Sequence, residues 1–414
     1  MKRKIIALGA AFILALVGVS AAIGATIEGH AYKEGAAQHD GISLVLELPP
    51  PIPTVGLAGL LFLLAGLGLL LHGRKNRGVR VAVAALATIG LGCVAYAAFD
   101  YATTTNTLGE YGFDDVEVGT YRLDASAPGY YSERVEPVVI EEGLNTLDDI
   151  TLQPIIPGFV LIPAGTFDMG TETEMCRDGD EDPIHQVTLT RSFYMQQTEV
   201  TQEQWVSVFG TNPSYHSGCD QCPVENVTWF DSVIYCNRLS QAEGLRPAYY
   251  SDSSYTTVFD GTPPVTSGTV YWDESAPGYR LPTESEWEYA CRAGTTTAYN
   301  SGQDNTECAD DCALLYLAWY RFSPAHETHP VGQKQANAWS LSDMHGNVWE
   351  WCWDWYTSTY PSGPVRDPTG PSTGSRRVSR GGGWASEADE CRSATRDDQH
   401  PSWSSGRRGF RPVI

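Results

Sequence analysis

The fold of the C-terminal part of the chain is decided by the stretch Asp343-Met344-His345-Gly346-Asn347-Val348-Trp349-Glu350-Trp351, which continues through Cys352 to Trp355. This stretch contains four of the 12 tryptophans, in a chain that also has 41 glycines and only 19% charged residues. That composition is typical of a loop-rich globule with an aromatic core. We therefore expect the tryptophans to pack in the core, and the alternative is that they line a groove.

Upstream of this stretch, short segments carry the signals of helices and strands. Thr283 and Glu286 have the spacing of a capping box, which predicts a helix that begins after Thr283. Thr201 is a second expected helix cap, and residues 229–242 have the apolar spacing of a helix. Residues 159–162 are expected to form a strand. Together these signals predict a loop-rich α+β domain.

An ordered set of motifs runs through this part of the chain. In sequence order the motifs are Phe159–Phe167, Glu199–Thr201, Pro223–Trp229, Tyr279–Ala290, His329–Gly332, Asp343–Trp351, Arg377–Trp384 and Gly409–Arg411. Each motif is weak alone, but the ordered set is specific, and it resembles the formylglycine-generating-enzyme (sulfatase-modifying-factor) family. The resemblance covers residues 157–414 and implies that family's fold, which is similar to the C-type lectin plan.

The resemblance also raises the question of copper chemistry. Members that make formylglycine oxidise a cysteine of a protein or peptide substrate with oxygen and a copper(I) ion, which two cysteines hold because Cu(I) prefers sulfur ligands. Counting forward from Gly381 places the first of these cysteines at Ser386 and the second at Cys391. Counting back from Gly409–Arg411 instead places the second at Ala388. We therefore interpret Cys391 as a core cysteine rather than a catalytic thiol, and we do not expect copper(I) to bind. The scattered histidines likewise give no support to the iron site of another branch of the family.

A calcium site is the second implication of the resemblance. The matching positions lie in the turn before the Trp-Glu-Trp motif: Asp343 and Glu350 with their carboxylates, and Gly346 and Val348 with their backbone carbonyls. Hard oxygen ligands of this kind suit calcium. The alternative is that the two carboxylates only cap the turn, and we favour calcium.

Two pairs of cysteines lie in polar loops of the same region. Cys219 and Cys222 are separated by two residues, and Cys308 and Cys312 by three. Four such thiolates would suit zinc, whereas an exported location favours disulfides that staple the loops. We favour disulfides, and the spacing does not reveal how they pair.

The first hundred residues carry signals for export and for membrane insertion. Residues 1–25 have a basic start, an apolar run and small residues, which predicts a signal peptide or an uncleaved anchor. Val55–Leu71 and Val81–Phe99 contain no charged residue and predict a transmembrane hairpin within residues 55–99. The loop 72–80 between them is basic and is expected on the cytoplasmic side. The rest of the chain would then lie on the periplasmic side of a bacterial-type inner membrane.

The segments on both sides of this hairpin show the pattern of short strands. Residues 26–54 and 100–153 show short alternating runs with turn residues between them, which predicts a small β-sandwich. The pieces are similar to the carboxypeptidase-regulatory-like sandwich, here interrupted by the hairpin.

The acidic net charge of the chain argues against nucleic-acid binding. The net charge is −23, and residues 101–414 hold 19 basic and 45 acidic residues, so a nucleic-acid partner is not expected. The sequence favours a membrane-anchored extracytoplasmic protein that acts as a binding or scaffold module. One alternative is an oxidoreductase that acts on a protein cysteine or uses a rearranged metal site. Another is a lectin-like binder of sugar or peptide. The sequence gives no oligomeric state.

Overall fold

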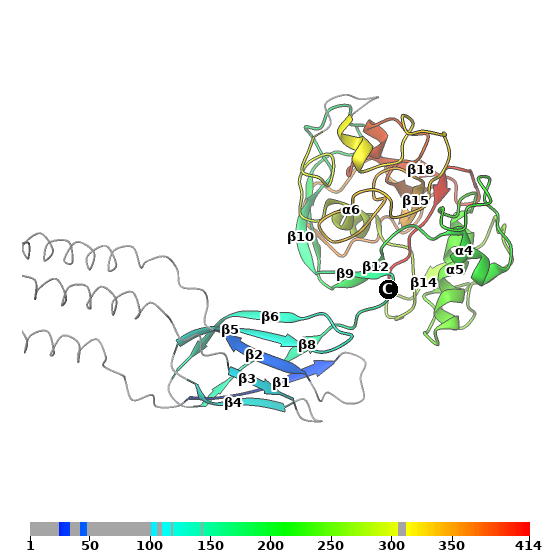
Figure 1. Cartoon of the computed structure of the whole chain (residues 1–414). Helices are drawn as coiled ribbons and strands as arrows, with labels where there is room; N and C mark the ends of the chain where they lie inside the picture. Colours follow the sequence, from blue (N-terminus) through cyan, green and yellow to red (C-terminus); the bar gives the residue numbers. More distant parts are fainter. Residues whose placement is uncertain are drawn as a thin grey trace, which may run out of the picture. The chain divides into compact units, whose positions relative to one another are not determined.

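A computed structural model describes residues 25–33, 42–47, 101–105, 110–116, 119–141, 144–304 and 312–414. The chain divides into two compact units, Met1–Ile155 and Ile156–Ile414 (Figure 1). The predicted transmembrane hairpin, and the predicted signal segment up to residue 24, lie outside the described residues. Within the described ranges, no helix is both long and apolar enough to span a bilayer.

The first unit consists of two sheets, of which one is mixed and the other is antiparallel. Its strands are β1 (Ala25–Lys33), β2 (Ser43–Glu47), β3 (Tyr101–Thr104), β4 (Glu110–Val116), β5 (Gly119–Ser126), β6 (Glu133–Ile140), β7 (Leu144–Thr146) and β8 (Ile150–Leu152). The mixed sheet has the order β4-β1-β7 with β8 also paired to β1, and the antiparallel sheet has the order β3-β2-β5-β6. Ala31, Leu44, Phe113 and Leu123, which come from both sheets, belong to one buried apolar cluster. Each sheet therefore joins strands from before and after residues 48–100.

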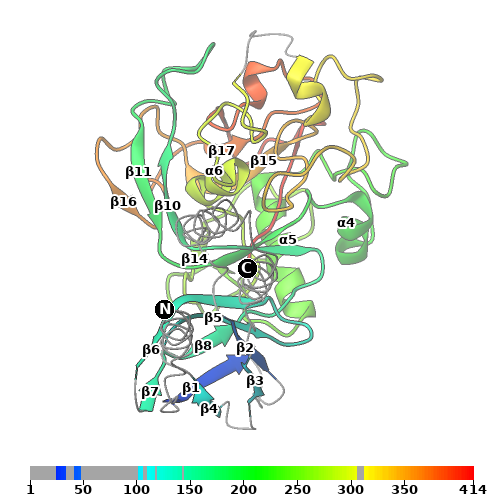
Figure 2. The same cartoon turned by 60° about the vertical axis from the view of Figure 1, so that its left-hand side comes forward.

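The second unit has short strands, few helices and long loops. Its elements are β9 (Phe159–Ile162), β10 (Gly165–Met169), β11 (His185–Leu189), β12 (Phe193–Gln196), α4 (Gln202–Phe209), α5 (Trp229–Ala242), β13 (Tyr249–Tyr250), β14 (Tyr271–Trp272), α6 (Glu284–Arg292), η1 (Cys312–Tyr316), β15 (Trp349–Trp355), β16 (Val365–Arg366), β17 (Arg377–Arg380), η2 (Asp389–Cys391), β18 (Arg396–Gln399) and β19 (Arg408–Gly409). The main sheet has the order β18-β17-β15-β19. Helix α6 packs against β15 and β17 of this sheet (Figure 2). The α+β, loop-rich prediction is confirmed.

Capping explains where the helices of this unit begin. The side chain of Thr283 accepts a hydrogen bond from the backbone of Glu286, and the Glu286 carboxylate accepts one from the Thr283 backbone, so the predicted capping box is confirmed. Thr201 caps α4 and Thr228 caps α5 in the same way. Each box satisfies two backbone donors that the first turn of a helix leaves without partners.

Three of the four tryptophans of β15 pack in the core. Trp351 is fully buried, and Trp349 is 7% exposed. Trp353 packs against Trp229 of α5 and against Tyr249 of β13, with ring centroids 5.5 and 5.3 Å apart. The core interpretation is confirmed for Trp349, Trp351 and Trp353, and Trp353 ties the main sheet to α5 and β13, whereas Trp355 is half-buried and lines a pocket.

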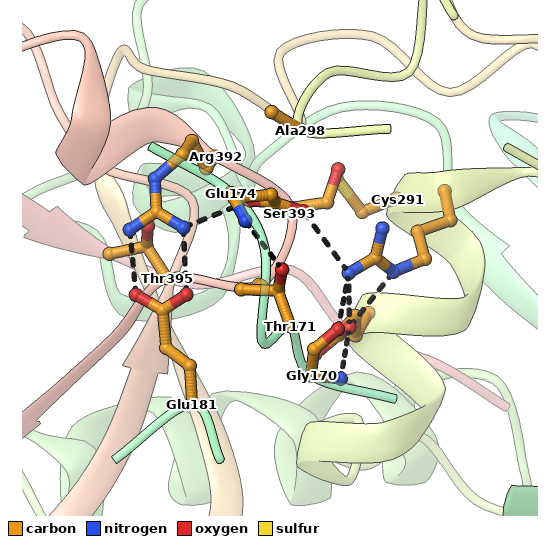
Figure 3. Close-up of polar contacts among 12 residues, drawn as sticks. Gly170, Thr171, Glu174, Glu181, Cys291, Ala298, Arg392, Ser393 and Thr395 are labelled. Carbon is orange, nitrogen blue, oxygen red and sulfur yellow. Dashed lines mark hydrogen bonds and ion pairs between the residues drawn. The ribbon is translucent and has the colours of Figure 1, made fainter. Parts of the chain in front are cut away.

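A buried ionic network holds α6 to the main sheet and to the loop between β10 and β11. Its eight side chains are each 5% exposed or less, and they are Glu174, Glu181, Glu284, Glu288, Arg292, Arg380, Arg392 and Arg396. Arg392 forms a bidentate pair with Glu181, with nitrogen–oxygen distances of 2.7 and 2.6 Å (Figure 3). The four acidic and four basic groups balance, which buried charges require.

Candidate functional site

The turn that leads into β15 is tightly built. Asp343, Gly346 and Asn347 adopt left-handed backbone conformations, with φ of 57°, 80° and 59°. A Cβ at Gly346 would lie 2.3 Å from the backbone oxygen of Trp319, so only glycine fits there. Every residue from 341 to 350 is buried. The turn therefore holds the predicted calcium residues Asp343, Gly346, Val348 and Glu350 in a closed, rigid segment.

The Glu350 carboxylate is held by two partners inside this segment. Arg411 donates to both of its oxygens, with Nη2 2.7 Å from Oε1 and Nε 3.0 Å from Oε2. The indole of Trp287 donates to Oε2 at 2.8 Å. Glu350 thus forms a buried ion pair with Arg411 that also fixes α6 against β15.

Asp343 and Glu199 are less well satisfied than Glu350. Asp343 Oδ2 accepts a hydrogen bond from Gly332 N at 2.6 Å, but its Oδ1 is buried without a partner in the described part of the chain. Both carboxylate oxygens of Glu199 are likewise buried without a described partner. Burial, and then the neighbouring Asp343 carboxylate, raises the pKa of Glu199 well above its usual range. Burial also raises the pKa of Asp343 to about 6.

Two of these groups, Glu199 and Asp343, have unsatisfied oxygens that suit a hard divalent cation, whereas the Glu350 oxygens already accept from Arg411 and Trp287. Glu199, Asp343 and Glu350 interact with one another and with Arg411, and the Lys334 ammonium also acts on Asp343, so the three ionised carboxylates exceed the two cations by one negative charge. The three unsatisfied oxygens belong to Glu199 and Asp343, and oxygen ligands of this kind suit calcium. A buried carboxylate oxygen without a partner is costly, which a cation would relieve.

Sequence reasoning missed Glu199 as a member of this set. It lies two residues before Thr201, the cap of α4, and the fold brings it to Asp343 across a large sequence distance. The signal for a buried carboxylate was the position of Glu199 between strand β12 and Val200, both of which are buried.

The expected copper positions do not form a thiolate pair. Ser386 Oγ accepts a hydrogen bond from Gly383 N at 3.1 Å. Cys391 is fully buried in an apolar cluster with Tyr299 and Leu317. A Cβ at Gly382 would lie 2.5 Å from the Cys391 sulfur, so the glycine is needed to seat this thiol. Burial, with the charges of Glu390 and Asp389, raises the pKa of Cys391 well above its usual range.

The loop cysteines are oxidised where they are described. Cys219 and Cys222 form a disulfide with each other, as favoured over zinc thiolates. Cys176 is also disulfide-bonded. Cys308 and the side chain of Cys312 lie outside the described residues.

One exposed and two half-buried aromatic rings lie beside the segment that carries Ser386. Tyr215 is 77% exposed, and its neighbour His216 packs edge-on against Trp384 with ring centroids 5.0 Å apart. His216 Nε2 and Glu225 Oε2 are buried and have no partner among the residues that the structure describes. We call Tyr215, His216, Glu225 and Trp384 the aromatic face.

Comparisons with known proteins agree with both resemblances. Residues 148–414 match the family described as sulfatase-modifying factor enzyme 1-like domain, and residues 74–153 match the carboxypeptidase regulatory-like domain. The chain is 39% identical over 221 residues to the chaperone protein LppX of Paenibacillus barcinonensis, across 48% of this chain and 71% of that protein. It is 30% identical over 282 residues to the formylglycine-generating enzyme of Streptomyces coelicolor, across 61% of this chain and 88% of the enzyme.

A solved structure supports the fold of the second unit. Treponema denticola variable protein 1 aligns with a TM-score of 0.54 and 33% sequence identity, across 62% of this chain and 94% of that one. Similarity therefore extends both to a protein named as an enzyme and to proteins that carry other names.

Proposed function

The chain belongs to the family of sulfatase-modifying factor enzyme 1-like domains, and from this membership we propose that its second unit is a calcium-stabilised binding module without copper–thiolate chemistry. The observation that carries the proposal is the state of the two copper positions. Ser386 offers a hydroxyl where a thiolate is needed, and a hydroxyl is a poor ligand for Cu(I). The Cys391 thiol is sealed under Gly382 and is held in its neutral form by burial.

Calcium enters the proposal through Glu199 and Asp343. Their unsatisfied oxygens, with Gly346, Val348 and Glu350 in the adjoining turn, would hold the ion. Bound calcium would neutralise the excess charge of the set and stabilise the turn that leads into β15. It would supply no redox chemistry, which agrees with a binding rather than an oxidising role.

The test of the copper proposal is metal content and turnover of the full chain. The chain is loaded anaerobically with Cu(I), and a Cys391→Ser variant is treated in parallel. Cys236→Ser is the matched control, because Cys236 is also a free and fully buried cysteine. The chains are then incubated in air with a peptide that contains Cys-x-Pro-x-Arg, and the mass of the peptide is measured by mass spectrometry.

We expect substoichiometric copper in all three chains and no mass change in the peptide. One copper per chain that only Cys391→Ser removes would overturn the proposal, as would formylglycine in the peptide. Those results would establish the oxidoreductase alternative.

We also propose that the chain is anchored in a membrane and that its second unit lies outside the cytoplasm. The two uncharged apolar runs, Val55–Leu71 and Val81–Phe99, and the basic loop between them support this arrangement. The Cys219–Cys222 disulfide supports it independently, because disulfides persist in oxidising compartments. Protease added to intact spheroplasts should remove the second unit, and protection until the membrane is lysed would refute the orientation.

The aromatic face is our candidate for the ligand-binding surface. Tyr215 offers an exposed ring, and next to it His216 and Glu225 have buried polar atoms without described partners. Aromatic rings with a few fixed polar atoms suit peptides and sugars alike. Binding to peptide and glycan arrays should weaken at least tenfold in Tyr215→Ala. Tyr316→Ala is the control, since Tyr316 is exposed to the same degree on η1. Equal binding by both variants would exclude this face.

A further inference from the structure

The Cys219–Cys222 disulfide lies between the backbone segment that follows Glu199 and the segment whose amide binds Asp343. We call residues 219–222 the disulfide loop. Within this loop, Cys222 N donates to Cys219 O at 3.0 Å, so the cross-link closes a tight turn. The loop makes backbone contacts with two segments that are remote from each other in sequence, one on the side of Glu199 and one on the side of Asp343.

The first segment directly follows Glu199. Gln202 N donates to Cys222 O at 2.9 Å, and Glu203 N donates to Asp220 O at 3.0 Å. Two residues after the loop, Val224 N donates to Val200 O at 2.8 Å. The disulfide loop and its continuation thus pair with the backbone from Val200 onward and fix the position from which the Glu199 side chain extends.

The second segment carries the amide that binds Asp343. Val331 N donates to Gln221 O at 2.9 Å, and the Cys222 sulfur lies 3.8 Å from Thr328 O. The next residue, Gly332, donates its N–H to Asp343 Oδ2 at 2.6 Å. The disulfide loop is therefore one residue away from the group that orients the Asp343 carboxylate.

The disulfide is placed where a reductant can attack one of its sulfurs. Cys219 is partly exposed, whereas Cys222 is 3% exposed. A thiolate that attacks the Cys219 sulfur breaks the bond between the two sulfurs and forms a mixed disulfide. A second thiol of the same reductant then resolves it. The chain gains two electrons and two protons as two thiols, and the dithiol is oxidised to a disulfide.

We propose that the Cys219–Cys222 disulfide is a redox control on the cation site, in which reduction loosens the disulfide loop and weakens calcium binding by Glu199 and Asp343. This inference rests on the proposed calcium site. In the oxidised chain the segments that carry Glu199 and Gly332 are ordered before calcium binds. Calcium binding therefore does not have to bear the entropic cost of ordering them. In the reduced chain the loop gains freedom that binding must remove, and the affinity falls. Because the cross-link closes a short loop, the expected effect is about five- to tenfold.

The test compares calcium affinity in three forms of the full chain. They are the oxidised wild type, the Cys219→Ser/Cys222→Ser variant, and a Cys176→Ser variant as the control for loss of another disulfide. Affinity is measured by isothermal calorimetry after chelation and dialysis, and circular dichroism checks folding. We expect about five- to tenfold weaker binding in the double variant and a change of less than about twofold in Cys176→Ser.

Hydrogen exchange gives a second readout that does not depend on the affinity. The amides of Val331 and Gly332 should exchange faster in the double variant, because the disulfide loop protects the first and aligns the second. If the double variant does not fold, dithiothreitol added to the folded Cys176→Ser chain reduces the same bond and gives the same comparison.

The outcomes separate the two proposals. Absence of calcium binding in the oxidised wild type refutes the calcium site, and the redox inference falls with it. Wild-type binding with equal affinity in the double variant overturns the redox inference and leaves the calcium site standing. Equal weakening in the double variant and in Cys176→Ser also overturns it, because the effect would then be one of general stability.

Discussion

Replacing Glu199 by glutamine should show two effects separately: how much the buried carboxylate destabilises the calcium-free fold, and how much it contributes to calcium binding. Glu199 is fully buried, neither of its oxygens has a described partner, and the Asp343 carboxylate lies close enough to disfavour its charge. Glutamine has nearly the same shape and no charge. We therefore expect Glu199→Gln to leave the calcium-free chain as stable as the wild type or more stable, while most of the stabilisation by calcium disappears.

The size of the lost stabilisation follows from mass action. At a calcium concentration one hundred times the dissociation constant, a ligand that binds only the folded state stabilises it by about 2.7 kcal/mol. For a unit of about this size, 1 kcal/mol shifts the melting temperature by about 2–4 °C. The wild type should therefore melt about 5–10 °C higher with saturating calcium than with a chelator, and the variant should show a small fraction of that shift.

Thermal unfolding followed by tryptophan fluorescence measures this shift, because Trp287, Trp349 and Trp351 lie next to the site and are buried. Glu225→Gln is the matched control. Glu225 is also fully buried and has one unsatisfied oxygen, but it belongs to the aromatic face. It should keep the full calcium shift. An undiminished shift in Glu199→Gln would refute the assignment of Glu199, and a wild type without any shift would refute the calcium site itself.

Three further predictions address the rest of the second unit. Burial raises the pKa of Asp354 to about 8, so the folded state should lose stability as the pH rises from about 4 to about 8. Asp354→Asn should remove this loss of stability. Denaturant titrations at several pH values measure the difference in unfolding free energy between variant and wild type, and a difference that does not grow with pH would contradict the prediction. Arg392→Met should cost about 3–5 kcal/mol in urea unfolding, since it leaves the buried Glu181 carboxylate without its bidentate partner. The added change Glu181→Leu should recover most of that cost, and a cost below about 1 kcal/mol for the single variant would refute the role of the pair. Ser386→Cys should not restore copper binding, because Cys391 stays buried and protonated; a stoichiometric copper that Cys391→Ser then removes would show otherwise.

Local signals in the sequence were sufficient for the helix starts and for the core. Thr201 and Thr283 cap the helices predicted from them, because a capping box depends on residues three positions apart. Three of the four tryptophans of β15 lie in the core as expected, since a large apolar ring is usually buried and the chain provides aromatic partners on α5 and β13.

Long-range polar pairing could not be predicted in the same way. The ionic network joins Glu181 to Arg392 across 211 positions, and the Glu350–Arg411 pair spans 61. The chain has 27 basic and 50 acidic residues, so sequence alone does not reveal which of them the fold buries together. Glu199 was missed for this reason, because its importance arises only when the backbone after β12 comes to lie beside the turn at Asp343.

The motif around Gly382 and Ser386 shows why a family motif and an activity must be argued separately. Gly382 has a positive φ of 73°, and a side chain there would collide with the Cys391 sulfur. Arg380, just before it, pairs with Glu288 of α6 and with backbone carbonyls of the segment after η2. Packing and charge pairing are therefore sufficient reasons for this arginine and this glycine, whether or not copper ever binds nearby. Residues that serve the fold identify the family, whereas the chemistry depends on the few positions that the fold does not need. At the first of those positions this chain has Ser386, whose hydroxyl is already bonded to the backbone of Gly383.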